Sequence, residues 1–158
     1  MIEITTPRQP EELDALRAIL RDYAAALGVD LCFQGFDVEL ANLPGAYIAP
    51  RGALLTAIFN GTLAGCCALR PLNNVDYPNA CEMKRLFVRP KFRGLGIGRL
   101  LAEAILDAAR QVGYTNLLLD TLSDMETARA LYHDLGFEDV PPYYHNPISG
   151  SHYLKVKL

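Results

Sequence analysis

The sequence has no apolar run approaching the roughly 18–20 residues that a membrane-spanning helix requires. Its first residues, Met1-Ile2-Glu3-Ile4, lack both the basic start and the apolar stretch of a secretory signal peptide. It has no C-x-x-C pair, and no histidine stands at metal-ligand spacing from a cysteine. These absences predict a cytoplasmic protein with no membrane partner and no bound metal ion.

Four cysteines are present, and none lies in a pattern that indicates chemistry. Cys66 and Cys67 are adjacent in an apolar stretch, so a strand would point them to opposite faces. Because free cysteine is readily buried, we expect these two, with Cys32 and Cys81, to be small core residues in a reducing compartment.

Composition and length indicate one globular unit. Hydrophobic residues make up 51% of the chain and charged residues 21%, which argues against disorder. Single domains usually have about 100–200 residues, so the 158 residues predict one domain over 1–158. The sequence leaves both a monomer and a homodimer open.

The net charge of −3 gives no reason to expect a nucleic-acid partner, but the charge is unevenly distributed. The other nine basic residues stand against all 18 acidic ones, while no acidic residue falls between 84 and 99. This local positive charge predicts a specific anionic ligand, although a solvated basic loop would show the same pattern. The segment holds six basic residues: Lys84, Arg85, Arg89, Lys91, Arg93 and Arg99.

Hydrophobic periodicity predicts an α/β chain with a central mixed sheet. Helices are expected from Glu11 to a stop at Gly28, within 30–45, from Gly98 to a stop at Gly113, and after Asp124 as an N-cap. Asn60-Gly61 between two apolar runs predicts a hairpin turn. Strands are expected at 2–5, 53–59, 62–69, 80–88, 117–120, 137–140 and 152–158.

The segment after the strand at 80–88 carries three alternating glycines, Gly94, Gly96 and Gly98, directly before a helix. Glycines let backbone N–H groups turn toward one point, and the helix N-terminus adds positive potential, which together suit a pyrophosphate. A Walker phosphate loop is excluded because no Lys-Ser or Lys-Thr follows the glycines. The dinucleotide pattern G-x-G-x-x-G is a closer competitor, and Asp120 imitates its ribose-binding acid, but the third glycine comes one residue early.

The run Arg93-Gly94-Leu95-Gly96-Ile97-Gly98, after Leu86-Phe87-Val88-Arg89-Pro90, resembles the acetyl-CoA-binding signature of the GNAT superfamily of N-acetyltransferases. The signature is commonly written [QR]-x-x-G-x-[GA]. A later run resembles the helix and following strand of the same family: Ala128-x-x-Leu131-Tyr132-x-x-Leu135-Gly136-Phe137. The resemblance implies the GNAT-like acyl-CoA N-acyltransferase fold, with a mixed, mostly antiparallel sheet flanked by helices.

The resemblance also implies how acetyl-CoA is held. The amides of residues 93–99, with Leu95, Ile97 and Arg99 among them, would bind the pyrophosphate. The edge formed by Leu86, Phe87 and Val88 would pair with the pantetheine arm, where the strand separates from 117–120 at a bulge. Val88 N–H would polarise the thioester carbonyl. Met125 stands where many family members carry a pantetheine-binding asparagine, which is a departure from the pattern.

Acyl transfer to an amine needs an acid for the departing thiolate and a base for the nucleophile. By family position, Tyr132 is the expected acid. Glu82, between Cys81 and Met83, is the expected base because an apolar setting raises a carboxyl pKa. An ion pair with Lys84 or a nearby arginine is an equally weighted interpretation of Glu82.

A second base candidate and an acceptor pocket are expected in the proline-bounded stretch Tyr143-Tyr144-His145-Asn146. Prolines lower the entropic cost of ordering such a loop, and its Tyr and His tips would line the pocket. His145 would also serve as a base, since an unperturbed imidazole has a pKa of about 6.5. The alternative is that these side chains only cover the core.

The sequence therefore predicts an N-acetyltransferase that moves an acetyl group from acetyl-CoA to a primary amine of a small molecule or peptide. The amine would attack directly in a ternary complex. Two rivals from other classes stay open: a non-catalytic acyl-CoA-binding module and, with less support, a nicotinamide-dependent oxidoreductase. Longer acyl groups and the identity of the acceptor stay open as well.

Overall fold

The computed structural model describes residues 1–28, 30–31 and 34–158, so the expectation for Cys32 lies outside the described residues. Within this part of the chain, seven strands form one sheet in the order β1-β2-β3-β4-β5-β7-β6. All neighbouring strands are antiparallel except β4 and β5, which run parallel. The strands are β1 (Ile2–Thr5), β2 (Ala53–Phe59), β3 (Thr62–Leu72), β4 (Ala80–Val88), β5 (Asn116–Leu122), β6 (Glu138–Val140) and β7 (Ser151–Lys157). The mixed, mostly antiparallel sheet is the predicted fold class.

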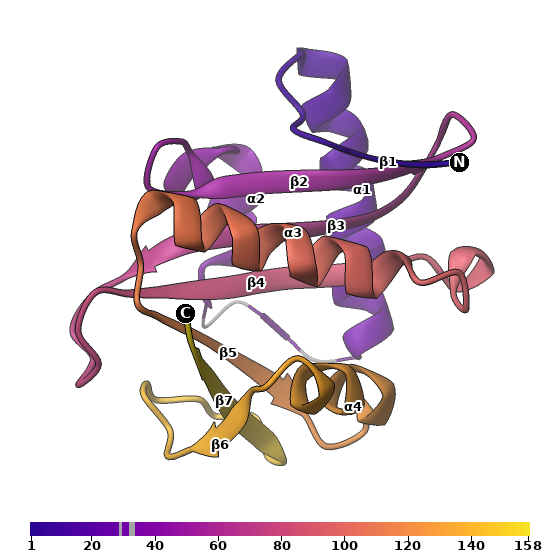
Figure 1. The fold of residues 1–158 in the computed structure, drawn as a ribbon. Coiled ribbons are helices and arrows are strands. Elements are labelled where there is room, and N and C mark those ends of the chain that lie inside the picture. The colour runs from indigo at the N-terminus through magenta and orange to yellow at the C-terminus, as the bar shows by residue number, and fades with distance from the viewer. Residues whose placement is uncertain (29, 32–33) are drawn as a thin grey trace.

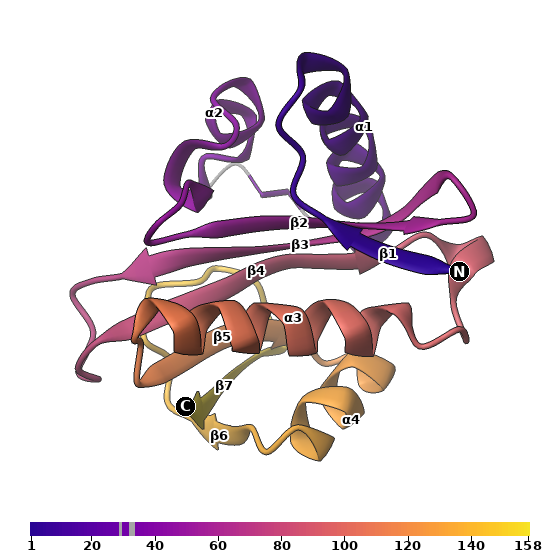
Figure 2. The same ribbon diagram turned by 45° about the horizontal axis from the view of Figure 1, so that its top comes forward.

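Helices cover both faces of the sheet (Figures 1 and 2). One face packs against the helix α1 and the short helix α2, and the other packs against α3, with α4 lying near the β5–β7 end of the sheet. Cys66 packs on the α1 side and Cys67 on the α3 side, as their adjacency predicts. The helices are α1 (Pro10–Leu27), α2 (Phe36–Ala41), α3 (Ile97–Val112) and α4 (Glu126–Asp134).

Local sequence signals account for most element ends. Gly28 closes α1 and Gly113 closes α3, both in the left-handed region with φ of 67° and 102°. Asn60 and Gly61 have φ of 49° and 84°, so the predicted hairpin turn between β2 and β3 is confirmed.

One predicted cap is wrong. Asp124 does not begin α4, because the chain first closes a turn in which Met125 N–H donates to the Leu122 carbonyl (3.0 Å). The helix starts one residue later, with Met125 at the N-cap position and no capping side chain. The loop thereby brings Asp124 and Met125 to the end of β5, beside the site described below.

β4 separates from β5 halfway along its length. Parallel pairing ends at Glu82 with Leu118, although β4 continues to Val88 and β5 to Leu122. On its other edge β4 pairs with β3 through a register shift that sets two residues, Arg85 and Leu86, against one. Arg85 has a φ of 63°, which is rare for a residue with a side chain. The expected bulge and the expected opening between the two strands are both confirmed.

None of the helices in the described part of the chain is long and apolar enough to pass through a membrane.

Candidate active site

A long groove opens where β4 leaves β5. Its volume is about 820 Å³, and its walls come from the C-terminal half of β4, the start of α3, the start of α4 and the end of α1. Nine of the ten residues predicted to hold a cofactor line this groove: Leu86, Phe87, Val88, Arg93, Gly94, Gly96, Ile97, Gly98 and Arg99. Leu95, the tenth, does not line it, and its side chain is 47% exposed.

Free backbone donors face the groove at the start of α3. The N–H groups of residues 94–99 donate to no acceptor within the described part of the chain, whereas Leu100 N–H already bonds the Gly96 carbonyl. Gly94 and Gly96 have φ of 84° and 82°, and no atom lies within 4 Å of where their Cβ atoms would be. The two glycines thus make an open, amide-lined cradle that fits an anionic group such as a diphosphate.

Fewer basic side chains surround the cradle than the sequence suggests. Of the six basic residues of the segment, Arg93 and Arg99 line the groove, and Arg99 also forms an ion pair with Asp134. Arg93 donates from Nε to the Val88 carbonyl (2.9 Å) and lies over the Phe87 ring, 5.6 Å from its centroid. Most of the positive charge at the groove therefore comes from backbone dipoles and one arginine without an acidic partner.

Three of the other four basic residues serve the fold. Arg89 pairs with Asp22 (3.3 Å), and Lys91 lies over the ring of Phe92. Arg85 binds Glu39 of α2 through two hydrogen bonds of 2.9 Å, and its side chain is only 2% exposed. The Arg85 pair joins the bulge of β4 to α2, which balances the cost of the unusual backbone conformation.

The edge of β4 that faces the opening has unpaired backbone groups. Arg89 N–H donates toward β3, to the Ala64 carbonyl (2.8 Å). Because backbone groups alternate along an antiparallel strand, those of Val88 point away from β3, toward the opening. The Val88 carbonyl indeed accepts from Arg93 rather than from β3, which leaves Val88 N–H directed at the groove.

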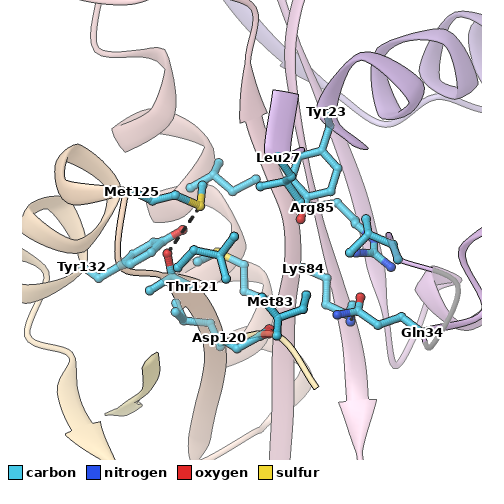
Figure 3. A pocket seen from close by; sticks show the side chains of 15 residues that line it. Tyr23, Leu27, Gln34, Met83, Lys84, Arg85, Asp120, Thr121, Met125 and Tyr132 are labelled. Carbon is cyan, nitrogen blue, oxygen red and sulfur yellow. Dashed lines mark hydrogen bonds between the residues drawn. The ribbon is translucent and has the colours of Figure 1, made fainter. Parts of the chain in front are cut away.

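A second, smaller cavity of about 60 Å³ lies deeper between β4 and β5 (Figure 3). It shares four lining residues with the groove, so the two spaces adjoin: Tyr23, Leu27, Leu86 and Met125. The polar side chains that line it include Lys84 from β4, Asp120 and Thr121 from β5, Tyr132 from α4 and Tyr23 from α1. The cavity has room for a few water-sized groups and holds both acidic and basic side chains.

Tyr132 enters this cavity from α4, with Met125 and Thr121 beside it (Figure 3). Its side chain is buried at 6% exposure, its ring packs on Phe137 with centroids 5.6 Å apart, and burial raises the pKa of the phenol. No residue in the described part of the chain forms a hydrogen bond with its hydroxyl. Among the described residues, Tyr132 therefore presents a protonated, unpartnered O–H to the smaller cavity, which adjoins the groove.

Glu82 lies apart from both cavities. Its carboxylate is 1% exposed, and one oxygen accepts from Arg70 Nε and Nη2 at 2.7 and 2.6 Å. The other oxygen accepts from the Tyr143 hydroxyl at 2.7 Å. An arginine is thus the partner of Glu82, one of the two alternatives that the sequence leaves open, and Lys84 is not.

The proline-bounded stretch packs over the face of the sheet that carries Glu82, but it lines neither cavity. Tyr143 holds Glu82, and Tyr144 donates to Asp120 Oδ2 at 2.6 Å. Asn146 Nδ2 is shared among Tyr144, Ser151 and, at 3.4 Å, Asp120. His145 is exposed and has no partner in the described part of the chain. The two tyrosines thus position carboxylates, and His145 takes no part in these contacts.

Sequence reasoning did not single out two residues of the smaller cavity, Asp120 and Lys84, as acceptor-site residues. Asp120 follows an apolar run, a pattern that places a charged residue at the end of a buried strand. Lys84 lies at alternate spacing from Glu82 on the same face, but only the opening between β4 and β5 shows that it borders a cavity.

A protein-family comparison matches residues 14–137 to a model described as the acetyltransferase (GNAT) family. An uncharacterized N-acetyltransferase of Schizosaccharomyces pombe is 40% identical over 158 residues, covering 99% of this chain and 95% of that protein.

Solved structures of similar shape include an acetyltransferase from Streptococcus agalactiae, with a TM-score of 0.80 and 23% identity over 99% of this chain and 98% of that one. The PaiA N-acetyltransferase of Thermoplasma acidophilum, solved with coenzyme A, has a TM-score of 0.73 and 17% identity, covering 100% of this chain and 99% of that one. At these identities the structural likeness concerns the fold.

Proposed function

The chain belongs to the acetyltransferase (GNAT) family, and from that premise we propose that it transfers the acetyl group of acetyl-CoA to a primary amine of a small molecule or peptide. Members of this family use acetyl-CoA. The acceptor, the base and the individual site residues are inferred from the contacts described above. The observation that carries the proposal is the amide-lined cradle at the start of α3, which adjoins a cavity containing a phenol and a carboxylate.

The groove has the parts that acetyl-CoA binding requires. The free N–H groups of residues 94–99 and the positive end of α3 would hold the diphosphate, with Arg93 beside it. Leu86 and Val88 would pair with the pantetheine arm along the open edge of β4. When bound, acetyl-CoA supplies an acyl group activated as a thioester, and Val88 N–H would polarise its carbonyl.

Tyr132 would act as the general acid. Its hydroxyl keeps its proton because burial raises the phenol pKa, and no neighbouring acceptor competes for that proton. The side chain would donate this proton to the departing sulfur and recover one from solvent after release.

Asp120 is a better candidate for the base than Glu82. Both donors to Asp120, Tyr144 and Asn146, bind Oδ2, and within the described residues no donor reaches Oδ1. Glu82 has donors on both oxygens and no access to either cavity. Asp120 would accept the proton that the amine nitrogen loses, and Glu82 would hold Arg70 and Tyr143 in place.

Titration calorimetry with acetyl-CoA tests the cofactor half of the proposal, and release of free thiol on a panel of amines tests the acetyl transfer. Saturable binding at micromolar to millimolar acetyl-CoA is expected, with amine-dependent thiol release. Binding without release on any amine would instead support a non-catalytic acyl-CoA-binding module. Absence of binding would refute both.

A further inference from the structure

Two opposite charges border the smaller cavity, one from each of two neighbouring strands. Lys84 reaches it from β4 and Asp120 from β5, beyond the last paired residues of the two strands (Figure 3). Tyr132 borders the same space, so both charges lie where an acceptor would have to sit. Their chemistry therefore bears on which amines fit.

Lys84 has an ammonium group without a carboxylate partner. Its Nζ donates to Gln34 Oε1 at 3.0 Å, and among the described residues no carboxylate forms an ion pair with it. An ammonium carries three donors, and the amide of Gln34 uses one of them. Burial lowers the pKa of Lys84, although the carboxylates of Glu82 and Asp120 act in the opposite direction, so its charge is only partly compensated in the protein alone.

The other charged groups nearby are already neutralised. Glu82 is bound to Arg70, and Arg85 is bound to Glu39 through both ends of its guanidinium. The Asp120 carboxylate is held in orientation by Tyr144, and among the described residues no donor reaches its Oδ1. Within this part of the chain, Lys84 and Asp120 are thus the two charged residues lining the cavity that form no ion pair.

Building on the proposed function, we propose that the acceptor is a small amine with a carboxylate next to its amino group, as in a free α-amino acid. Lys84 binds the acceptor carboxylate, and Asp120 binds the amino group that is acetylated. In such a zwitterion the two charged groups are one carbon apart, so one small cavity can satisfy both. A carboxylate at Lys84 also compensates a buried charge, a gain that an uncharged group cannot provide.

The size of the cavity supports a small acceptor. Its volume of about 60 Å³ accommodates a few water-sized groups, which suits an amino acid head rather than a folded protein segment. Gln34 borders the cavity beside Lys84 and bridges it to Tyr144, because its Nε2 lies 3.4 Å from the Tyr144 hydroxyl. This chain of contacts ties the cation site to the anion site.

The test compares matched acceptors on the full-length enzyme with saturating acetyl-CoA. Each of the 20 common L-amino acids is paired with its α-carboxamide and, where one exists, its decarboxylated amine, and thiol release is followed. We expect at least one free amino acid to exceed its amide and its amine about 10- to 100-fold in kcat/KM, the range for a hydrogen bond to a charged group.

The variant Lys84→Met keeps most of the side-chain length and removes the charge. It should raise KM for the preferred amino acid by a similar factor, while its rate on the decarboxylated amine and its affinity for acetyl-CoA stay within about twofold. Lys157→Met, at the exposed end of β7, is the matched control and should change none of these values. Removing an unpaired buried charge should leave the melting temperature unchanged or raised, so loss of folding is not expected.

The outcomes separate this inference from the proposed function. If amines and amides are acetylated as well as free amino acids, or if Lys84→Met loses equally on all acceptors, the inference is overturned and acetyl transfer stands. If acetyl-CoA binds but no amino acid is acetylated, the inference is overturned as well. If acetyl-CoA itself does not bind, it is the proposed function that fails.

Discussion

Two buried side chains, Tyr132 and Glu82, differ in what holds their polar atoms. Glu82 has a donor on each oxygen, while the hydroxyl of Tyr132 has no partner in the described part of the chain. In the described part of the chain the Tyr132 hydroxyl is not a fully buried atom, so it can meet water or a ligand in the smaller cavity although its ring is buried. At the scale of single residues, the partners of a group indicate its role better than its burial does.

Replacing Tyr132 with phenylalanine should lower kcat without unfolding the protein. General acid catalysis contributes about 10²–10⁴-fold, so a loss of at least about 100-fold in kcat is expected. The Kd for acetyl-CoA and the melting temperature should hardly change, because the lost hydroxyl has no partner and the ring still packs on Phe137. Single-turnover kinetics and calorimetry measure the two effects, and an unchanged kcat would remove Tyr132 from the acid role.

Asp120→Asn should lower activity with little effect on stability, and Glu82→Gln should do the reverse. Asp120→Asn removes the proposed proton acceptor but keeps its shape, so kcat/KM should fall at least about 100-fold with little change in stability. Glu82→Gln leaves Arg70 without its charge partner. Because Arg70 is 38% exposed, we expect a moderate loss of about 1–3 kcal/mol in the free energy of unfolding and a small effect on kcat.

Urea unfolding and acetyl transfer, measured on both variants, test this assignment. The reverse pattern, with activity lost in Glu82→Gln and stability lost in Asp120→Asn, would return the base role to Glu82.

At the scale of elements, the site depends on how β4 and α3 end. β4 bulges at Arg85 and leaves β5 after Glu82, and the chain then runs through a short turn into the glycines that open α3. Each break in regular structure leaves backbone donors unpaired, along the β4 edge and at the start of α3. The groove is built mainly from these donors rather than from charged side chains.

Gly96 and Gly98 make a matched pair for testing the cradle. Gly96 has a φ of 82°, so Gly96→Ala forces a strained conformation costing about 1–2 kcal/mol and should turn the amides away from the ligand. Gly98 lies inside α3, where an added Cβ would make ordinary contacts with Val88 and Leu131 at 3.8 and 4.0 Å. We expect Gly96→Ala to weaken acetyl-CoA binding about tenfold and Gly98→Ala to change it little.

Calorimetry with acetyl-CoA checks both substitutions. Equal affinity in the two variants would mean that the conformation of the loop at Gly96 does not determine cofactor binding.

At the scale of the whole molecule, many acidic groups are buried in their protonated form. Burial raises the pKa of Cys66 and Cys81 from 9.0 to about 12, and it raises the pKa of Tyr132, Tyr143 and Tyr144 above 10.0. The folded state thus keeps protons that the unfolded state releases above about pH 9. Their stabilising contribution is complete below that pH and is lost as the pH rises toward 12.

The free energy of unfolding should therefore fall between about pH 9 and about pH 10.5, by up to about 1.4 kcal/mol per pH unit for each group that ionises on unfolding. Lys84 has a lowered pKa and acts in the opposite direction, but it is one group against several. Urea titrations across this range measure the slope. Replacing Cys66 and Cys81 with alanine should make the slope shallower, and a slope unchanged by the double substitution would contradict the assignment.

The residues of the cofactor loop were the easiest part to predict from sequence, for a physical reason. Positive φ at Gly94 and Gly96, the turn at Asn60-Gly61 and the helix stops at Gly28 and Gly113 are local requirements that few residues satisfy. Local sequence therefore predicted the hairpin and the strand–loop–helix unit, and nine of the ten residues predicted to hold a cofactor line the groove. The order of helices and strands followed from periodicity in the same way.

The sequence could not decide which side chains pair with each other across the sheet. These pairings depend on contacts between residues far apart in the chain. Glu82 meets Arg70 and Tyr143, Arg85 meets Glu39, and Asp120 and Lys84 line one cavity. The separation of β4 from β5 creates that cavity, and only the folded sheet shows which side chains it exposes. Local steric rules thus determine the proposed cofactor site, whereas long-range packing and charge compensation determine the proposed acceptor site.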